Sequence, residues 1–440
     1  MLILPPYLKV YSMARMRDSG IKWIGLIPEN WMCKPIRALF EEVSAKNTLG
    51  LESKALKFTY GSIVRKTDFD VEDDEYVVNA IRNYTLVRPG TIMLNGLNLN
   101  FDFVSQRIGL VREKGAITSA YMAFKAKDDQ VIDPEFATYM LKVYDGCKAF
   151  HNMGGGVRKI LNFSELKRHY FPYPTVECQR KIVDYVNHKC SKIDGLRANI
   201  QSEIDTLEEY RQSIIAESVT HGLNEKVALK NSGVAWCPKI PKHWTVANPK
   251  GLFSLRTERA FPGDKQLTAS QEYGIIFQDE YMELTGNRIV TVLKDFSILK
   301  HVEPNDFVIS MRSFQGGLEY SEKRGCISSA YVMLIPNEKY VYAPFYRWFF
   351  KSSKYINALQ STSNLVRDGQ AMRYANFVQI PLFIIPKEEQ IAIAHYLDDR
   401  VGKIDRVLSV KKDQLKVLEE YKRSIIYEYV TGKREVPNEA

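Results

Sequence analysis

Residues 193–215 read IDGLRANIQSEIDTLEEYRQSII, and residues 404–426, lying 211 positions later, read IDRVLSVKKDQLKVLEEYKRSII. In both stretches the seam positions recur at alternating spacings of four and three residues, which is the heptad pattern of a coiled coil. Most of these positions are apolar, and the others hold Arg197, Arg211, Lys411 and Lys422. Upstream of each, a proline precedes acidic residues, Pro174 before Glu177 and Pro386 before Glu388, as the helix dipole favours at a helix start. The pattern predicts two long helices with the same seam at the same phase.

The apolar seam determines how these helices can pack. The predicted seam residues are Val186, Ile193, Ile200, Ile204, Leu207 and Ile214 in the first helix, and Leu397, Val401, Ile404, Leu408, Leu415, Leu418 and Ile425 in the second. Because the phase is identical, the helices can pair with each other, and a chain returning towards its first half makes that pair antiparallel. A helix over 177–219 would be about 65 Å long at 1.5 Å per residue, which suits a spacer. The alternative is that each helix packs on its own domain.

A second repeat opens each half of the chain. Residues 18–31 read DSGIKWIGLIPENW, and residues 231–244, lying 213 positions later, read NSGVAWCPKIPKHW. The tryptophans that flank Ile-Pro could stack on bases, but such aromatics more often anchor a strand to a core, and we favour the core. Two copies of the same order of segments predict two similar halves in one polypeptide, so a duplicated ligand is the natural target.

Mixed strand and helix signals fill the region between these markers. Residues 87–94 and 302–309 each place a turn ahead of a short apolar run, and Pro134 and Pro344 each open an amphipathic segment. Strands and helices do not alternate regularly along the chain, so the pattern does not predict a parallel sheet. We therefore expect two similar α+β domains separated by two long helices that form an antiparallel coiled coil, with pseudo-twofold symmetry. The expected ranges are an N-terminal extension at 1–17, domain 1 at 18–175, helix 1 at 176–223, domain 2 at 224–385, helix 2 at 386–436 and a tail at 437–440.

Composition limits the class of protein. Of the 440 residues 45% are hydrophobic, which is ample for folded cores, and the formal net charge of +9 favours an anionic partner such as nucleic acid. The six cysteines form no C-x-x-C pair and are interpreted as reduced thiols. No window offers the roughly 20 apolar residues of a membrane span, so we expect no membrane association and a cytoplasmic protein.

Catalytic motifs are absent from the sequence as we interpret it. It contains no G-x-x-x-x-G-K-S/T, H-E-x-x-H or G-x-S-x-G, and Leu4-Pro5-Pro6-Tyr7 lacks the polar side chain that an amino-methyltransferase needs at its first position. Cys147 and His151 form a close pair without a second pair at ligand spacing. We expect no catalytic residues, no metal and no cofactor.

Two pairs of polar loops are the remaining candidates for chemistry, because the members of each pair occupy equivalent places in the two halves. Arginine, asparagine and glutamine can make bidentate contacts to base edges, whereas serine and lysine suit phosphates. The alternative is that these are ordinary solvated turns. The candidate DNA-binding residues are Asn95, Asn98, Asn100, Gln106, Arg107, Arg158 and Lys159 in the first half, and Arg312, Ser313, Gln315, Arg367 and Arg373 in the second.

Taken together, these features resemble the specificity subunit of type I restriction-modification systems, from about residue 18 to the C-terminus. The resemblance is carried by two repeated segments, Ser19-Gly20 through Trp31 and Ser232-Gly233 through Trp244. It is carried further by the helix start Pro174-Thr175-Val176-Glu177-Cys178-Gln179. It is also carried by Lys192-Ile193-Asp194 and Lys403-Ile404-Asp405, each followed by Leu-Glu-Glu-Tyr. The second helix start departs slightly, as Pro386-Lys387-Glu388-Glu389-Gln390.

This resemblance implies a non-catalytic, sequence-specific DNA-binding subunit of a methyltransferase and endonuclease complex. Each target recognition domain would read one half of a bipartite double-stranded target, while the helices set the spacing. Modification subunits, two in number, would dock on the helices, and restriction subunits would join for cleavage. The alternatives are a self-sufficient methyltransferase or nuclease fragment, and a coiled-coil adaptor that does not bind DNA.

Overall fold

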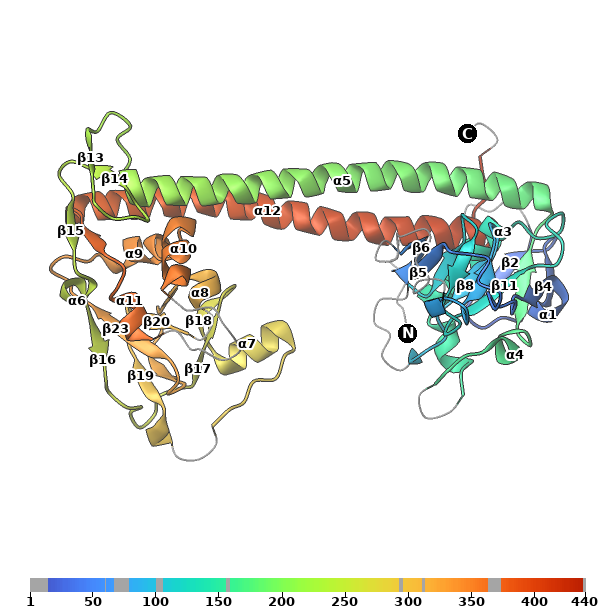
Figure 1. Cartoon of the computed structure of the whole chain (residues 1–440), viewed down its shortest axis with the longest axis horizontal. Helices are drawn as coiled ribbons and strands as arrows, with labels where there is room; N and C mark the ends of the chain where they lie inside the picture. Colours follow the sequence, from blue (N-terminus) through green and yellow to red (C-terminus); the bar gives the residue numbers. More distant parts are fainter. Residues whose placement is uncertain are drawn as a thin grey trace. The chain divides into compact units, whose positions relative to one another are not determined.

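The computed structural model describes residues 15–59, 61–66, 79–99, 106–155, 159–292, 296–310, 313–362 and 373–437. It divides into two units (Figure 1). Unit 1 comprises residues 1–199 and 414–440, and unit 2 comprises residues 200–413. Each unit therefore holds one α+β domain, part of the long helix that follows it, and part of the other long helix. The mixed content of helix and sheet confirms the predicted α+β class.

Domain 1, in unit 1, is built mainly on two four-stranded sheets. One has the order β4 (Phe40–Glu42), β11 (Met122–Ala126), β8 (Ile92–Leu94), β9 (Ile108–Leu110), and all its pairs are antiparallel. The other has the order β6 (Ser62–Arg65), β5 (Ala55–Thr59), β10 (Gly115–Ile117), β7 (Thr85–Val87), with β5 and β10 parallel. Two antiparallel pairs complete the strands, β1 (Met16–Asp18) with β2 (Leu26–Pro28) and β3 (Met32–Pro35) with β12 (Tyr170–Tyr173). Its helices are α1 (Ile36–Leu39), α3 (Pro134–Gly146), η3 (Ala149–Asn152) and α4 (Phe163–Leu166).

Domain 2, in unit 2, repeats this plan in the same chain order. The sheet β16 (Phe253–Arg256), β23 (Val332–Pro336), β20 (Phe307–Ile309), β21 (Glu319–Tyr320) corresponds to β4-β11-β8-β9. The other strands pair as β13 (Leu229–Asn231) with β14 (Lys239–Pro241), β15 (Thr245–Ala247) with β24 (Leu382–Ile384), β17 (Leu267–Ser270) with β18 (Gly274–Phe277), and β19 (Lys300–Val302) with β22 (Gly325–Ile327). The helices are α6 (Pro249–Leu252), α7 (Gln278–Thr285), η4 (Phe296–Ile298), α8 (Ser313–Gly316), α9 (Ala343–Phe349), α10 (Ser353–Ser361) and α11 (Tyr374–Phe377).

Aromatic side chains fill the interior of both domains. Trp31 and Trp244 are buried, as favoured from the sequence, and Trp236 packs edge-on against Phe349 and Tyr355. In unit 1 the core continues from domain 1 onto both long helices through Val186, Ile193 and Ile425. Domain 1 is therefore fixed to the helix segments of its own unit by a shared apolar core.

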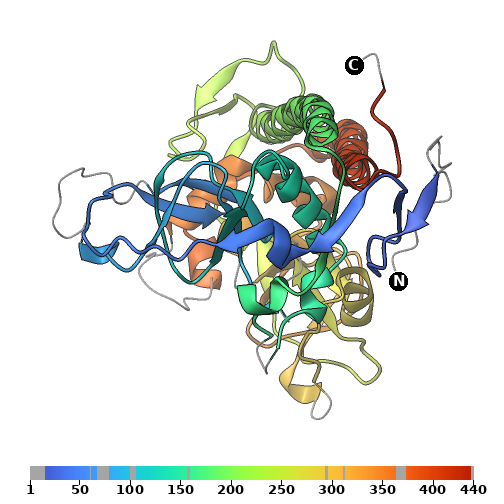
Figure 2. The same ribbon diagram turned by 90° about the vertical axis from the view of Figure 1, so that its right-hand side faces the viewer.

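The two long helices are α5 (Val176–His221, 46 residues) and α12 (Lys387–Val430, 44 residues). In unit 1, Asp194 pairs with Lys422 at 2.7 Å, while Arg197, three residues later, pairs with Glu419, three residues earlier, at 3.1 Å. In unit 2, Arg211 pairs with Asp405 at 2.8 Å and Lys411 with Glu203. Residue numbers rise on one helix as they fall on the other, so the helices are antiparallel within each unit. The end-on view in Figure 2 shows α5 and α12 next to each other.

The observed burial follows the heptad seam. Val186, Ile193, Leu397 and Val401 are fully buried, and no seam residue named from the sequence is classed as exposed. The charged seam positions Arg197, Arg211, Lys411 and Lys422 each pair with a carboxylate of the other helix. If the two helices paired in a shifted register, these four cations would lose their carboxylate partners and face apolar side chains. The four ion pairs therefore specify the register.

The two Lys-Ile-Asp triplets have equivalent structural roles. Asp194 accepts from Lys422, and Asp405 accepts from Arg211, so each triplet aspartate contacts the cation that follows Leu-Glu-Glu-Tyr on the opposite helix. The Lys-Ile-Asp and Leu-Glu-Glu-Tyr motifs thus supply the two partners of one contact between the helices. This contact occurs once in each unit.

A buried glutamine attaches the start of each helix to its domain. The Gln179 amide nitrogen donates to the carbonyl oxygens of Val131 and Pro174, and its amide oxygen accepts from the Asp133 N–H at 2.8 Å. Gln390 does the same, donating to Tyr340 and Ile385 and accepting from the Tyr342 N–H. Both glutamines are fully buried. This explains physically why glutamine stands in both helix starts.

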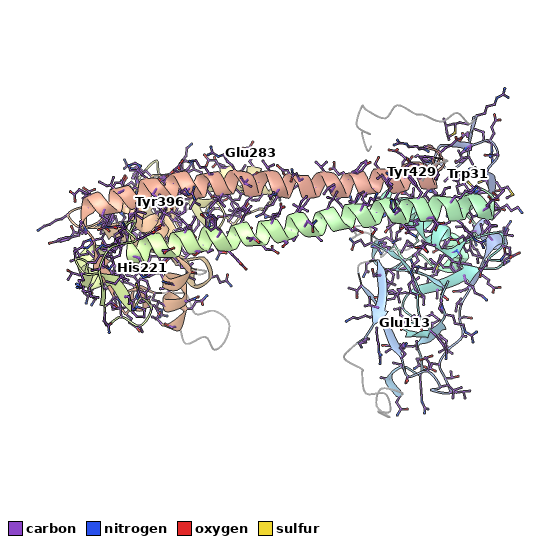
Figure 3. All side chains as sticks on the ribbon, turned by 90° about the horizontal axis from the view of Figure 1, so that it is seen from above. Trp31, Glu113, His221, Glu283, Tyr396 and Tyr429 are labelled. Carbon is purple, nitrogen blue, oxygen red and sulfur yellow. The ribbon has the colours of Figure 1, made fainter. Side chains whose placement is uncertain are left out.

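Some predicted ranges need correction. Met16 and Arg17 belong to β1, so the N-terminal extension predicted at 1–17 does not reach residue 17. Helix 1 ends at His221, ahead of 223, and helix 2 ends at Val430, ahead of 436, because Gly222 and Gly432 adopt the left-handed backbone that ends a helix. A side chain at 432 would collide with Pro28 and Trp31, so the end of α12 packs tightly on domain 1. Figure 3 shows Tyr429 of α12 beside Trp31 in unit 1, and His221 and Tyr396 within unit 2.

Across the described part of the chain, none of the helices combines the length and the apolar character that crossing a bilayer requires.

We expect the substitution Gln179→Leu to destabilise unit 1 by about 2–3 kcal/mol, because it leaves one buried N–H and two buried carbonyls unpaired. Chemical denaturation of the full chain measures the loss. Gln201→Leu, on an exposed turn of the same helix, is the matched control and should change stability by no more than about 0.5 kcal/mol. Equal stability of the two variants would contradict a role for Gln179 in attaching the helix.

Candidate nucleic-acid interface

Three segments of domain 1 that carry predicted DNA-binding residues meet at one edge of the sheet. The loop after β8 contacts residue 107 through the Asn95 N–H and the Arg107 carbonyl, at 2.9 Å. The same loop contacts the 159–161 segment through Leu99 N–H to Lys159 O at 3.2 Å and Leu161 N–H to Gly96 O at 2.9 Å. Gly96 is required here, because a Cβ would overlap the carbonyl oxygen of Leu161. Main-chain hydrogen bonds thus join residues separated by more than sixty positions in the sequence.

Exposure separates the candidates of domain 1. Asn98, Gln106 and Lys159 are exposed and available to a ligand, and Asn98 has φ 49°, a left-handed conformation. Asn95 is half-buried, and its side-chain oxygen accepts from the Leu97 N–H, so it stabilises the turn.

The prediction that Arg107 contacts DNA is wrong. Its side chain is only 7% exposed, and the guanidinium donates to the carbonyl oxygens of Asn95, Leu97 and Asn98. These contacts direct the guanidinium into the loop, away from the surface where a base edge could reach it.

In domain 2 the loop after β20 forms the short helix α8. The prediction for Ser313 is also wrong, because this side chain is 1% exposed and its hydroxyl oxygen accepts from the Ser310 N–H at 2.8 Å. Gln315 is exposed on α8, and α8 lies against α10. Arg373 is exposed at the start of α11. The described part of the chain gives no contact between Gln315 and Arg373. Asn100, Arg158, Arg312 and Arg367 lie outside the described residues.

Sequence reasoning missed the residues that hold these loops from inside. In domain 1, Asp145 of α3 is 1% exposed and accepts from the Arg107 N–H at 2.8 Å. In domain 2, the ammonium group of Lys351 donates to the Gly316 carbonyl at 2.9 Å and to Glu319 at 2.6 Å. Burial raises the pKa of the Glu319 carboxyl, an effect that Lys351 opposes. The repeat pattern could not reveal these contacts, since they depend on the direction of side chains that lie outside the loops.

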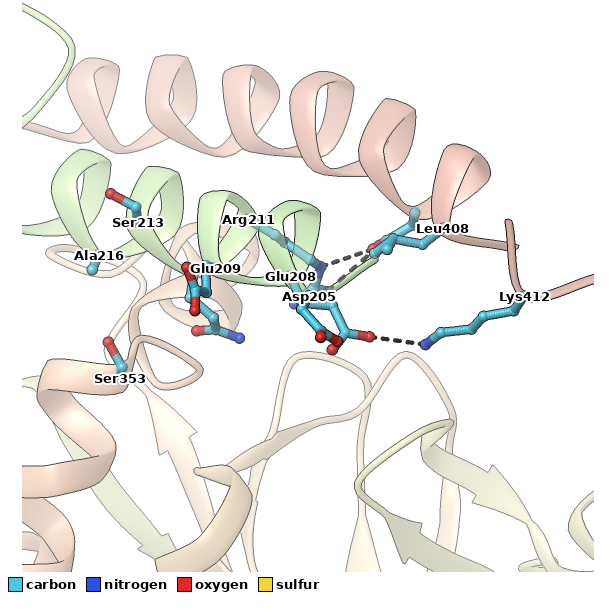
Figure 4. Close-up of a pocket in the computed structure, with 11 residues that line it drawn as sticks. Asp205, Glu208, Glu209, Arg211, Ser213, Ala216, Ser353, Leu408 and Lys412 are labelled. Atoms are coloured by element: carbon cyan, nitrogen blue, oxygen red, sulfur yellow. Dashed lines mark hydrogen bonds and ion pairs between the residues drawn. The ribbon is translucent and has the colours of Figure 1, made fainter. Parts of the chain in front are cut away.

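A cleft of about 820 Å³ lies between the two helices and α10 in unit 2 (Figure 4). Its charged lining is largely paired: Arg211 contacts Asp405, and Lys412 contacts Glu208 at 2.9 Å. Among the described residues no group of three or more His, Cys, Asp or Glu side chains could hold a metal ion. We assign no catalytic role to this cleft, whose charges belong to the helix pairing.

Comparison with known proteins identifies the fold. A solved structure titled as the basis of complex assembly and conformational transition of the type I R-M system superposes with a TM-score of 0.64 and 13% identity, covering 93% of this chain and 99% of that chain. This chain therefore shares the fold of that structure.

Two curated proteins of Methanocaldococcus jannaschii are similar in sequence. The "Putative type I restriction enzyme MjaX specificity subunit" is 22% identical over 428 residues, covering 93% of this chain and 95% of its own length. The "Type I restriction enzyme MjaVIII specificity subunit" is 23% identical over 356 residues, covering 74% of this chain and 76% of its own length. No protein-family model matches the chain. The resemblance to type I specificity subunits that the repeats indicated is confirmed along nearly the whole chain.

We expect Lys159→Ala to weaken DNA binding by a similar factor for all sequences and to lower the salt dependence by about one counterion, because an exposed lysine beside the loop suits a phosphate. We expect Gln106→Ala to act differently, with a loss of about 1–3 kcal/mol in preference at one base pair. Titrations of duplex variants at several salt concentrations separate the two effects. If neither variant changes affinity or preference, this surface does not contact DNA.

Proposed function

We propose that this chain is the sequence-specific DNA-binding subunit of a type I restriction-modification complex and is not itself an enzyme. The observation that carries the proposal is the near full-length similarity to specificity subunits, combined with two equivalent domains in one chain. Each domain places a polar loop after the same strand of the same sheet, β8 in domain 1 and β20 in domain 2. The net charge of +9 suits a polyanionic partner. No comparison supports a self-sufficient enzyme or an adaptor without DNA.

Each domain would read one half of a two-part target. Asn98 and Gln106 of domain 1 and Gln315 of domain 2 have side chains that can make paired hydrogen bonds to a base edge, and all three are exposed. Lys159 and Arg373 would neutralise phosphates nearby. The loops differ in sequence, and the domain 2 loop forms the helical turn α8. Two different half-sites are therefore expected, with centres roughly 10 bp apart.

The helices would act as the spacer. The register is specified twice, by Asp194 with Lys422 in unit 1 and by Asp405 with Arg211 in unit 2. A continuous helix of 46 residues transmits this register along its length, at about 1.5 Å per residue. The gap between the half-sites would follow from the helix length.

Modification subunits would dock on the exposed sides of the helices, and restriction subunits would join the assembled complex. Unit 1 carries Leu196 and Tyr421, which are 53% and 55% exposed, at nearly the same level of the helix pair. Unit 2 carries the equivalent pair, Val407 and Tyr210, at 45% and 46% exposed. Large apolar side chains exposed on both members of a pair are typical of a protein interface. One such patch in each unit fits two modification subunits.

Methylome sequencing of cells with and without this chain tests the proposed function. We expect one methylated motif made of two short blocks and a fixed gap to disappear when the chain is deleted. Methylation by the purified chain alone would establish the enzyme alternative. An unchanged methylome, together with failure to bind duplex DNA at low salt in the presence of its partners, would favour the adaptor.

Insertion of one heptad into both helices tests the spacer role. Seven residues between Glu203 and Ile204 and seven between Val410 and Lys411 preserve the seam phase and lengthen the pair by about 10.5 Å. At 3.4 Å per base pair, the gap of the recognised motif should grow by about three base pairs. The matched control inserts the heptad into α5 alone, which breaks the register and should abolish recognition. An unchanged gap in the double insertion would rule out the helices as the ruler.

Substitution of the exposed patches tests docking. Leu196→Ser with Tyr421→Ser should lower the number of bound modification subunits from two to one, because only the patch of unit 1 is lost. Adding Val407→Ser and Tyr210→Ser should lower it to none. Native mass spectrometry of the complex counts the subunits, and Val290→Ser, on an 89% exposed residue of domain 2, is the control. Two bound subunits in every variant would place the docking surface elsewhere.

A further inference from the structure

The loop after β8 in domain 1 is closed around a buried guanidinium. Arg107 Nη1 donates to the carbonyl oxygens of Asn95 at 2.8 Å and Leu97 at 2.7 Å, and Nη2 donates to Asn98 at 3.3 Å. The Arg107 N–H is in turn held by the buried carboxylate of Asp145. Three carbonyls that converge on one planar cation can adopt only a narrow range of loop conformations.

The loop after β20 in domain 2 is held by a different cation from a different element. Lys351 follows α9 and donates to the Gly316 carbonyl at the end of α8, and to the carboxylate of Glu319 at the start of β21. Glu319 is only 3% exposed, and Gly317 packs so closely on the Phe350 carbonyl that a Cβ would overlap it. Lysine supplies a single ammonium centre where domain 1 has a fork, and it therefore supports a different loop shape.

We infer that Arg107 and Lys351 are positioning residues for specificity, each fixing the shape of the loop that reads one half-site. Neither side chain reads a base, since Arg107 is directed at main-chain carbonyls and Lys351 at the Gly316 carbonyl and the Glu319 carboxylate. Arg107 binds the carbonyl of the exposed Asn98 and adjoins the exposed Gln106 in the chain. Lys351 binds the last residue of the helical turn that carries Gln315. This inference rests on the proposed function and identifies which residues support each recognition loop.

The effect of losing such a cation differs from a loss of stability. A loop that has lost its cation loses more conformational entropy when it binds, whatever the DNA sequence. It also no longer holds its Asn and Gln side-chain amides in one arrangement, so discrimination between sequences falls more than affinity. The effect should also stay within one half-site, since the two cations lie in different domains. Reduced folding stability would instead lower the binding of the whole bipartite target.

The test uses Arg107→Lys and Lys351→Met in the full chain assembled with its modification subunits. Affinities are measured for the intact bipartite duplex and for duplexes with single base changes in either half. We expect Arg107→Lys to reduce discrimination at least tenfold in one half-site only, and Lys351→Met to do so in the other half-site only. Each variant is the control for the other. Unchanged discrimination in both halves, or equal losses in both halves for each variant, would overturn the inference.

Amide hydrogen exchange without DNA gives a second readout that does not depend on the proposed function. In Arg107→Lys the amides of residues 97–99 should exchange at least tenfold faster, while β8 and β9 stay protected. Wild-type rates in that loop would overturn the role of Arg107 as a clamp. If the wild-type complex recognises no bipartite duplex but the loop loosens as expected, the proposed function fails while the structural clamp stands.

Discussion

The contact between the triplet aspartate of one long helix and the cation after Leu-Glu-Glu-Tyr on the other is the constraint on which the rest of the structure depends. It occurs as Asp194 with Lys422 and as Asp405 with Arg211. Exposed ion pairs contribute little to stability, so their main effect is on register. The apolar seam alone would tolerate a shift by one heptad, whereas the charged positions would then lose their partners. Register in turn decides where the end of α12 meets domain 1.

Each helix is also fixed at both of its ends. Gln179 and Gln390 attach the helix starts through three buried hydrogen bonds each, and Gly222 and Gly432 end the helices against tryptophan-bearing hairpins. Lys433, just beyond α12, donates to the carbonyl oxygens of Ile24 and Leu26 in domain 1. These contacts make each domain and its helix segments one packed body. A recognition loop on such a body has a defined position relative to the helix start, which a spacer function requires.

The sequence predicted the elements that depend on periodicity and repetition. Heptad spacing identified the helices and their seam, and the repeated segments 18–31 and 231–244 identified the start of each half. It could not predict what depends on side-chain direction. Arg107 looked like a base-reading arginine because it lies in a polar loop, but nothing local distinguishes a guanidinium that faces solvent from one that binds three carbonyls. Lys351 was missed because it lies outside the loop it supports.

Zero-length carbodiimide cross-linking of lysine to carboxylate tests the antiparallel pairing most directly. The protein is prepared as a mixture of isotope-labelled and unlabelled chains, and the linked peptides are identified by mass spectrometry. The account predicts links from Lys422 to Asp194, Lys411 to Glu203 and Lys412 to Glu208, each within a single chain. Links in the parallel order, or links that join labelled to unlabelled chains, would contradict it.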